Sequence, residues 1–458
     1  MPRFKIELTD DLISSNSGLV FVGEALHHLG FDKHLAELSC IKAMKKIPST
    51  DILRAYLGIL CIGKNSFESI DDYKDDPYFR KALGLKYIPS KETLRQRLEE
   101  LSIPELESGL KSFNSKMLKR FGEFKTALDT NMVPVDFDVT PMDNSKSHKE
   151  GVSNTYKQFM GYAPMMTYIG GTGYMLNNQF REGKAHSNCE GTREYIREAL
   201  DLARTITSGT LLARFDSGND SAENILEISS FDNVHYLIKQ NFRREDQLPY
   251  IHYARMNAST TETPRQGKTV HYASRKILLS FKQPNGQVKE VETRQVLRFI
   301  ERTIDKQGNG LLIPDQELDA WFTDLPDGQS GLPESYTEQK VIALYADHGT
   351  SEQFHSEFKT DMDMERLPSG KFDTNRLVMV LGMLAFNLLR IIGQQSLKTG
   401  LIKRKRSVQR IRIRKVLQDI MYMACQFMIK CKRKTLKLAR CNAYAQPLIK
   451  AYSLMFVT

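Results

Sequence analysis

The sequence predicts an α/β protein in which a sheet with packed helices is interrupted by an antiparallel β insertion. Three observations predict this class. Apolar and polar residues alternate with period two after about residue 125, a helical pattern separates these strand-like segments, and a turn-rich series of further strands follows between 241 and 340. Helical patterns on either side, the second one strongly basic, complete the chain.

The composition is that of an ordinary globular protein with a polyanionic partner. The 458 residues are enough for two or three domains with a substantial core. A formal net charge of +10 favours a polyanionic partner over an acidic protein. The six cysteines form no CxxC pair and have no companion histidines at zinc spacing, so we expect reduced thiols in a cytoplasmic protein.

The sequence shows no pattern of a secretory signal or a membrane span. The N-terminus, MPRFKIELTDD, has no apolar core of the kind that a signal needs. The longest apolar run, 377–393, is broken by Asn387 and Arg390, and it is shorter than the roughly 18 apolar residues of a membrane span. We therefore expect a buried helix there and no membrane partner.

Residues 1–125 have helical patterns and form the N-terminal region. The cluster at 49–51 is a predicted cap for the apolar helix that follows, and Ser90 is a predicted cap for a second helix. That second helix carries Arg95 and Arg97. A helix-turn-helix DNA reader and a plain helical bundle fit this pattern equally well, and we expect DNA binding from this region.

Residues 126–240 predict the first part of a catalytic core. The segment 133–140 alternates with period two, which places Asp136 and Asp138 on one face of a strand. Two more strands, a helix at 190–207 and a short apolar strand ending at Asp216 follow. In such sheets, functional groups gather at the carboxyl ends of the strands.

Residues 241–340 interrupt this rhythm with short strand-prone segments between NG, GNG and DG turns, which predicts an antiparallel insertion. The insertion carries Trp321, the only tryptophan. The core resumes at 341–395 with the stretch YADHGTSEQFHSEFK. There Glu352 and Lys359 are two helical turns apart with His355 between them, and Tyr345 and His348 extend the same helix face upstream.

Residues 396–458 form a basic C-terminal region with KRKR at 403–406, RIRIRK at 410–415 and KCKRK at 430–434. Apolar residues lie between the charges, which favours a folded surface over a solvated tail. We expect this region to contact DNA, to support dimerisation, or both.

Three acids stand out by their context: Asp138 on the first strand, Asp216 at the end of the buried strand, and Glu352 on the helix after the insertion. Carboxylates at buried strand ends need a partner, and oxygen donors suit Mg²⁺ or Mn²⁺ better than zinc. Two such ions about 4 Å apart can activate a hydroxyl group and stabilise the leaving oxygen of a phosphoryl transfer.

These residues resemble the DDE transposases of bacterial insertion sequences, in the branch with the Tyr-x2-Arg-x3-Glu-x6-Lys signature, and most closely the group 1 DDE transposase domain. The signature arginine is replaced by His348. The other matches extend over almost the whole chain: Tyr345, Glu352 and Lys359, DxDxT at 136–140, RxDSG at 214–218, RxGxxHS at 181–187, and DPYFRKALG and PSKETLRQR near the N-terminus.

The resemblance implies an RNase H-like core with Asp138, Asp216 and Glu352 as the catalytic ligands of two Mg²⁺ or Mn²⁺ ions. It implies DNA or phosphate contacts by a second group of residues, Tyr345, His348, Lys359, Arg181, His186 and Arg214. Trp321 is the candidate for stacking on a flipped base, with core packing as the alternative. The implied partners are double-stranded DNA, as terminal inverted repeats and as target, and a second copy of the chain when DNA is bound.

The leading hypothesis from the sequence is therefore a cut-and-paste transposase that acts through a hairpin intermediate, in the bacterial cytoplasm and associated with the nucleoid. Two alternatives stay open. The first is a transposase-derived DNA-binding protein without catalysis, because His348 replaces the signature arginine. The second is an RNase H-like nuclease that hydrolyses DNA without strand transfer.

Overall fold

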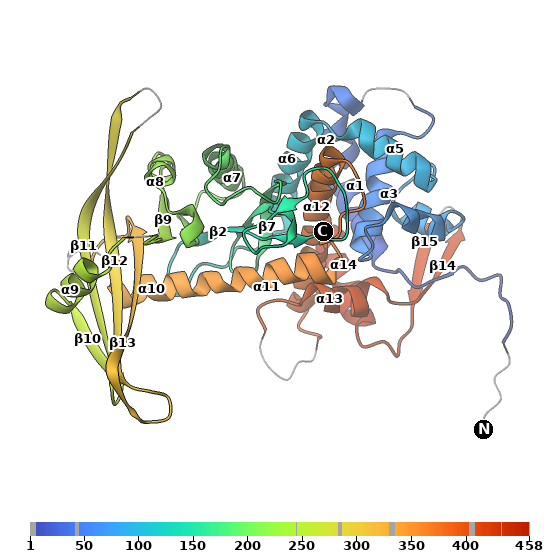
Figure 1. Ribbon diagram of the computed structural model, residues 1–458. Coiled ribbons are helices and arrows are strands. Elements are labelled where there is room, and N and C mark those ends of the chain that lie inside the picture. The colour runs from blue at the N-terminus through green and yellow to red at the C-terminus, as the bar shows by residue number, and fades with distance from the viewer. Residues whose placement is uncertain are drawn as a thin grey trace.

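Long strands lie at one end of the molecule and most helices at the other, with a sheet between them (Figure 1). The computed structural model describes residues 6–41, 45–243, 245–282, 286–328, 335–402, 408–431 and 433–457. The fold is a mixed α/β arrangement around a nine-stranded sheet.

The N-terminal region is helical, as predicted. Ser90 Oγ accepts a hydrogen bond from the Thr93 backbone N–H, which confirms the predicted cap. The predicted cap at 49–51 is wrong, because Asp51 instead accepts hydrogen bonds from the backbone of Lys86 and Tyr87. The α-helices here are α1 (Leu19–His28), α2 (Phe31–Ala36), α3 (Ser49–Cys61), α4 (Pro77–Ala82), α5 (Lys91–Leu101) and α6 (Pro104–Phe121).

One half of the nine-stranded sheet has parallel central strands. Its order is β9-β8-β2-β6-β7, with β2 parallel to β8, β8 parallel to β9, and β6 antiparallel to both of its neighbours. Apolar residues on both faces bury this half, as expected for parallel strands. The strands are β2 (Val133–Val139), β6 (Met165–Ile169), β7 (Tyr174–Gln179), β8 (Leu211–Phe215) and β9 (Val234–Lys239).

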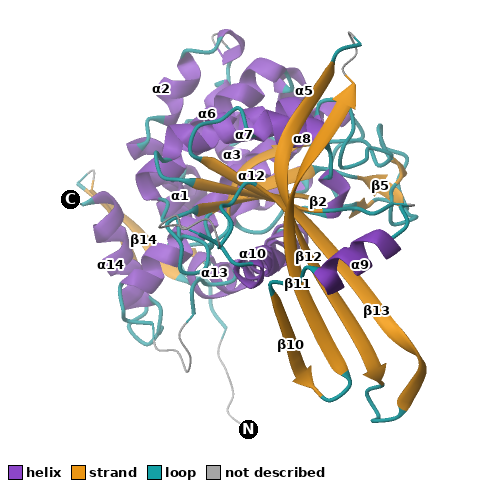
Figure 2. Cartoon of the chain, turned by 90° about the vertical axis from the view of Figure 1, so that its left-hand side faces the viewer, coloured by secondary structure: helices purple, strands orange, loops and turns teal. Residues whose placement is uncertain are grey.

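The predicted insertion continues the same sheet in the order β10-β11-β12-β13, and β13 pairs with β9. Its strands are longer than predicted, because segments that looked separate join within β11 and within β13. Cross-strand ion pairs, such as Arg302 with Asp315 and Glu317, link two of these strands on their solvent-exposed part. The elements are β10 (Thr260–Arg265), β11 (Lys268–Lys282), β12 (Val288–Ile304), β13 (Gly310–Thr323) and α9 (Leu248–Met256), which lies against the strands (Figure 2).

Helices cover the core sheet, and one of them runs through the centre of the molecule. That helix, α12, is long and apolar enough to cross a membrane, but the segment that passes this test is wholly buried by protein, which confirms the predicted buried helix. It packs against α3, α6, α14 and β7. The helices around the sheet are α7 (Thr192–Ile206), α8 (Ala222–Ile228), α10 (Glu338–Ala346), α11 (Ser351–Ser356) and α12 (Phe372–Lys398).

The C-terminal region folds back onto the N-terminal helices. Strand β14 pairs with β1 and with β15, and α14 contacts α1 and α12. The predicted basic cluster at 403–406 lies outside the described residues. The elements are β1 (Ile13–Ser14), α13 (Ile413–Val416), a π-helix (Leu417–Met421), β14 (Cys425–Lys430), β15 (Arg433–Leu438) and α14 (Ala445–Phe456).

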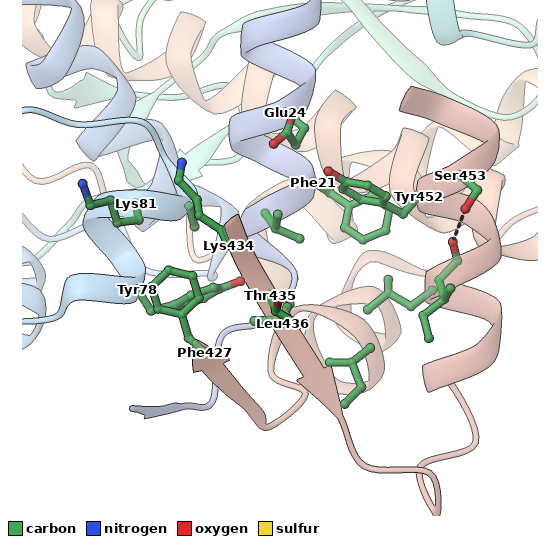
Figure 3. Close-up of a pocket in the computed structure, with 15 residues that line it drawn as sticks. Phe21, Glu24, Tyr78, Lys81, Phe427, Lys434, Thr435, Leu436, Tyr452 and Ser453 are labelled. Carbon is green, nitrogen blue, oxygen red and sulfur yellow. Dashed lines mark hydrogen bonds between the residues drawn. The ribbon is translucent and has the colours of Figure 1, made fainter. Parts of the chain in front are cut away.

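A mainly apolar pocket of about 310 Å³ lies between the N-terminal and C-terminal elements (Figure 3). Phe21 and Tyr452 line one side of it, and Tyr78 and Phe427 line the other. None of the three predicted catalytic carboxylates is among its described lining residues, but Lys434 of the basic segment 430–434 is one of them.

Asn387 joins the central helix to the sheet and is fully buried. Its side-chain amide donates to Asn114 Oδ1 and to the Met175 backbone carbonyl, both at 2.7 Å, and accepts from the Met175 N–H at 2.9 Å. Asn387→Ala leaves these buried groups without partners, so we expect the free energy of unfolding to fall by about 3 kcal/mol.

Urea unfolding followed by circular dichroism measures this change. The control is Asn257→Ala, which removes an exposed hydrogen bond to the Tyr253 carbonyl at the end of α9. A loss at Asn387 no larger than at Asn257 would show that the buried amide does not hold the helix to the sheet.

Candidate active site

The three predicted catalytic carboxylates line one cleft of about 760 Å³. Asp138 is on β2, Asp216 follows the last residue of β8, and Glu352 is in the first turn of α11. Since β2 and β8 are parallel neighbours, their carboxyl ends meet at the same edge of the sheet. The cleft also brings together three residues predicted to contact DNA, which are Tyr345, His348 and Lys359.

A buried ion pair lies directly beneath the cleft. Arg214 on β8 faces Asp136 on β2 in register, and its Nε and Nη2 donate to the two carboxylate oxygens at 2.6 and 2.9 Å. Its Nη1 donates to the Leu344 carbonyl at 2.7 Å and to Asp347 Oδ2 at 2.9 Å. The predicted DNA contact of Arg214 is therefore wrong, because its guanidinium is buried and all of its nitrogens have partners.

Asp136 stays ionised beneath the cleft. Burial acts to raise the pKa of Asp136, but the charge of Arg214 and the contact with His348 lower it to about 2. The His348 ring is buried, with Nδ1 3.1 Å from Asp136 Oδ1. His348 thus lines the cleft, and the group that its ring contacts there is the carboxylate of Asp136.

Asp138 is held by His355, which sequence reasoning had placed on the same helix face without assigning it a role. His355 Nε2 donates to Asp138 Oδ2 at 2.9 Å, and its Nδ1 accepts from the Tyr168 hydroxyl at 3.2 Å. Burial opposes ionisation of Asp138, but the hydrogen bond from His355 outweighs it and holds the pKa of Asp138 below the usual range. Asp138 is therefore a fixed, ionised carboxylate.

Asp216 has the opposite electrostatic environment. Burial raises the pKa of Asp216, and the negative charge of Asp138 raises it further. Asn219 Nδ2 donates to Asp216 Oδ1 at 2.7 Å, which offsets only part of this effect. Two carboxylates in each other's field are a site where a bound cation relieves repulsion.

Glu352 and Lys359 are on a helix that is less regular than predicted. After α10 ends at Ala346, the chain forms a 3-10 turn (Asp347–Thr350), then α11, then a π-helix (Glu357–Asp361). Glu352 is exposed in the cleft, and Lys359 Nζ donates to the Pro141 carbonyl at 2.9 Å. Among the described residues, no group of three or more His, Cys, Asp and Glu side chains is close enough together to hold a metal ion as it stands.

The π-helix is clamped by the segment RIRIRK. Glu357 pairs with Arg390 and Arg410, and Asp361 pairs with Arg412. Arg410 also donates to Gln353, the residue after Glu352. Arg410 and Arg412 belong to the region predicted to contact DNA, but they neutralise carboxylates on the Glu352-bearing segment. They hold that segment in place.

The remaining predicted residues lie outside the cleft lining. Arg181 is buried and donates to Gln179, His186 and Thr192, so it supports the loop around it. His186 is exposed. Trp321 is 2% exposed and packs against Tyr345, which agrees with the alternative of core packing for this ring.

Tyr156 and Lys157 also line the cleft, and sequence reasoning missed them. They lie in the loop between β4 (Ser153–Asn154) and β5 (Met160–Tyr162), which form a small sheet with β3 (Met142–Asp143). An aromatic residue next to a lysine in a turn is the one available signal, and it is too common to be specific. His355 had a stronger signal, because it is three residues after Glu352.

Comparison with known proteins gives a family match over nearly the whole chain. The family of the transposase DDE domain group 1 matches residues 2–456. Among solved structures, the chain is similar to a piggyBac transposase in a synaptic complex with hairpin DNA. The sequence identity is 13% and the TM-score 0.39, over 88% of this chain and 78% of that chain. No curated protein matches the chain.

The buried Arg214 pair generates a stability prediction. Arg214→Met leaves Asp136 ionised and buried without its main partner, so we expect the free energy of unfolding to fall by about 3–5 kcal/mol. Arg214→Lys keeps the charge but loses the forked geometry, and we expect an intermediate loss.

Chemical denaturation of purified variants measures both losses. Arg95→Met is the matched control, since Arg95 is half exposed and pairs with Glu99 on the helix surface. We expect it to change the free energy of unfolding by less than about 1 kcal/mol. Equal effects at Arg95 and Arg214 would contradict the role of the buried pair.

Proposed function

The chain belongs to the family of transposases with a group 1 DDE domain, and we propose from this that it binds the terminal inverted repeats of a bacterial insertion sequence, cuts the element ends and joins them to a target. The observation that carries the proposal is the meeting of Asp138, Asp216 and Glu352 on one cleft. We assign the chain to the Tyr-x2-Arg-x3-Glu-x6-Lys branch, with cut-and-paste transposition through a hairpin intermediate.

The sheet topology supports an RNase H-like core. The strand order β7-β6-β2-β8-β9, with an antiparallel β2–β6 pair and a parallel β2–β8 pair, places Asp138 on the central strand. The neighbouring parallel strand then leads to Asp216. In this assignment, 126–240 and 341–395 are the two parts of the core and 241–340 is the insertion.

The donor set fits a hard divalent cation, Mg²⁺ or Mn²⁺. All three side chains offer oxygen atoms, and the raised pKa of Asp216 beside Asp138 is relieved by positive charge. Asp138 and Asp216 would hold two such ions. Glu352 would be a further ligand from the exposed side of the cleft. When bound, the ions supply Lewis-acid stabilisation of the attacking and leaving oxygens.

The chain's own residues position the carboxylates and the DNA. His355 fixes the orientation of Asp138 through Nε2, so that the second carboxylate oxygen, Oδ1, faces away from that hydrogen bond. Lys359 is held at the cleft by the Pro141 carbonyl, where its ammonium group can bind a phosphate. Tyr345 lines the same cleft. Together these groups would place a scissile phosphate against the carboxylates.

The net charge of +10 supports double-stranded DNA as the partner, both as terminal repeats and as target. We propose that two copies of the chain act together on DNA, in the cytoplasm and at the nucleoid. The paired arginines of the RIRIRK segment leave the N-terminal helices and the rest of the C-terminal region as the candidate repeat readers.

The carboxylate assignment is tested by Asp138→Asn, Asp216→Asn and Glu352→Gln. We expect each to lower DNA cleavage in Mg²⁺ by about a thousandfold or more, since each removes several kcal/mol of transition-state stabilisation. Binding of the repeat, measured by fluorescence anisotropy, should stay close to that of the wild type.

Asp129→Asn is the matched control, because Asp129 is a fully exposed carboxylate that lines the adjoining cavity on the other side of Glu352. We expect it to cut normally. Normal cleavage by any of the three cleft variants would remove that residue from the catalytic set.

A second candidate function, DNA binding without catalysis, is favoured by His348 in place of the signature arginine. We expect the wild type to cut DNA without the His348→Arg substitution, because His348 already contacts Asp136 beneath the cleft. Gel assays of both forms in Mg²⁺ and in Mn²⁺ measure this. No cleavage by either form would favour the binding-only function, and cleavage without joined target products would favour a nuclease.

A further inference from the structure

The loop between β4 and β5 is a hydrogen-bonded hairpin turn at the rim of the cleft. The Thr155 backbone N–H and its hydroxyl both donate to the Phe159 carbonyl, at 2.8 and 2.9 Å, and the Gln158 N–H donates to the Thr155 carbonyl at 2.9 Å. Gln158 has a φ of 64°, which is uncommon for a residue other than glycine. This tight turn holds Tyr156 and Lys157 at its tip.

The Tyr156 ring lies beside the catalytic carboxylates and is still 52% exposed. Its hydroxyl donates to the carbonyl of Val139, the residue next to Asp138, at 3.5 Å. Burial raises the pKa of Tyr156 to about 12, and the charges of Asp138 and Asp216 act in the same direction. The Tyr156 ring is thus a partly exposed part of the cleft wall, in the field of both carboxylates.

Lys157 places a positive charge at the same rim. Its ammonium group is 5.9 Å from the centroid of the Tyr156 ring. Burial lowers the pKa of Lys359, and although Glu365 opposes this effect, the charge of Lys157 adds to it, so the two ammonium groups are in each other's field. No ion pair of Lys157 occurs among the described residues. Two like charges at the mouth of a cleft are stabilised by an anion between them.

Trp321, the stacking candidate from sequence, is sealed in the core and cannot offer a face to a base without repacking of Tyr345. Tyr156 is instead about half exposed at the cleft. Aromatic rings bind unpaired bases by stacking, and this contact is worth about 1–3 kcal/mol per base. A lysine beside the ring binds the phosphate of the same strand.

We propose that Tyr156 and Lys157 form a nucleotide-binding site at the DNA end, in which the Tyr156 ring stacks on an unpaired base next to the scissile phosphate. The ammonium groups of Lys157 and Lys359 bind the flanking phosphate between them. The site seats one strand of the opened end against the carboxylates. This inference rests on the proposed transposase function and adds residues that position the substrate.

The test uses the full chain and a duplex that ends at the inverted repeat flanking the gene, with 2-aminopurine at each of the terminal positions in turn. Stacking on Tyr156 quenches the fluorescence of the base analogue, and it can be read in EDTA without any chemistry. We expect quenching at one terminal position by the wild type, Tyr156→Phe and Tyr156→Trp, and its loss in Tyr156→Ala. Tyr87→Ala is the control, because Tyr87 is 54% exposed and lies outside the cleft lining.

Lys157 is tested by the salt dependence of binding. Lys157→Ala should lower the slope of log affinity against log salt by about 0.7–0.9, the change for one phosphate contact. Lys184→Ala, at an exposed lysine on a neighbouring turn, should leave the slope unchanged. In Mg²⁺, Tyr156→Ala should lower kcat/KM for cleavage at least about fivefold, and Tyr156→Phe should restore it.

The outcomes separate this inference from the proposed function. If the wild type cuts the end but Tyr156→Ala quenches and cuts as the wild type does, the inference is overturned and the transposase function stands. An unchanged salt slope in Lys157→Ala overturns the phosphate contact alone. If the wild type neither binds nor cuts the end, both the function and the inference fail.

Discussion

The Arg214 guanidinium on β8 connects this strand to β2 and to the end of α10, the segments that lead to the three candidate carboxylates. Arg214 is two residues before Asp216 on β8, and its partner Asp136 is two residues before Asp138 on β2. Its third contact, with the end of α10, is a few residues before Glu352. Side chains two residues apart on a strand point to the same face of the sheet. The pairing of Asp136 with Arg214 therefore also sets the face on which Asp138 lies, which is that of the cleft. The geometry of the candidate site therefore depends on a buried charge pair that is not part of the cleft lining.

Arginines of α12 and of the C-terminal region neutralise the segment that follows Glu352. Glu357 and Asp361, on the π-helix after Glu352, are buried and would be costly without Arg390, Arg410 and Arg412. Part of the positive charge of the C-terminal region thus neutralises buried carboxylates of the protein itself. Only its unpaired basic side chains are available for DNA. The Glu352-bearing segment is held between Arg214 at one end and this clamp at the other.

The sequence predicted the strands of the core and the buried helix from local signatures, which are period-two alternation and an apolar run. It also selected three acids, two at strand ends and one on the helix after the insertion, that the fold brings to one cleft. It did not predict the partners of Arg214 or of Arg410. A basic residue next to a catalytic motif suggests a contact with phosphate. Only the tertiary structure shows whether that residue already forms an ion pair with a carboxylate of the protein. The 3-10 turn and the π-helix around Glu352 were equally hidden, since the residue pattern of this stretch is that of a regular helix.

The central claim is that Asp138, Asp216 and Glu352 belong to one cation site. Fe²⁺ with ascorbate replaces Mg²⁺ at such sites and cuts the polypeptide next to its ligands, and mass spectrometry locates the cuts. We expect cuts near all three residues in the wild type, suppression by excess Mg²⁺, and loss of all three in Asp216→Asn. Cuts near only one of them, or a pattern unchanged in Asp216→Asn, would contradict a shared site.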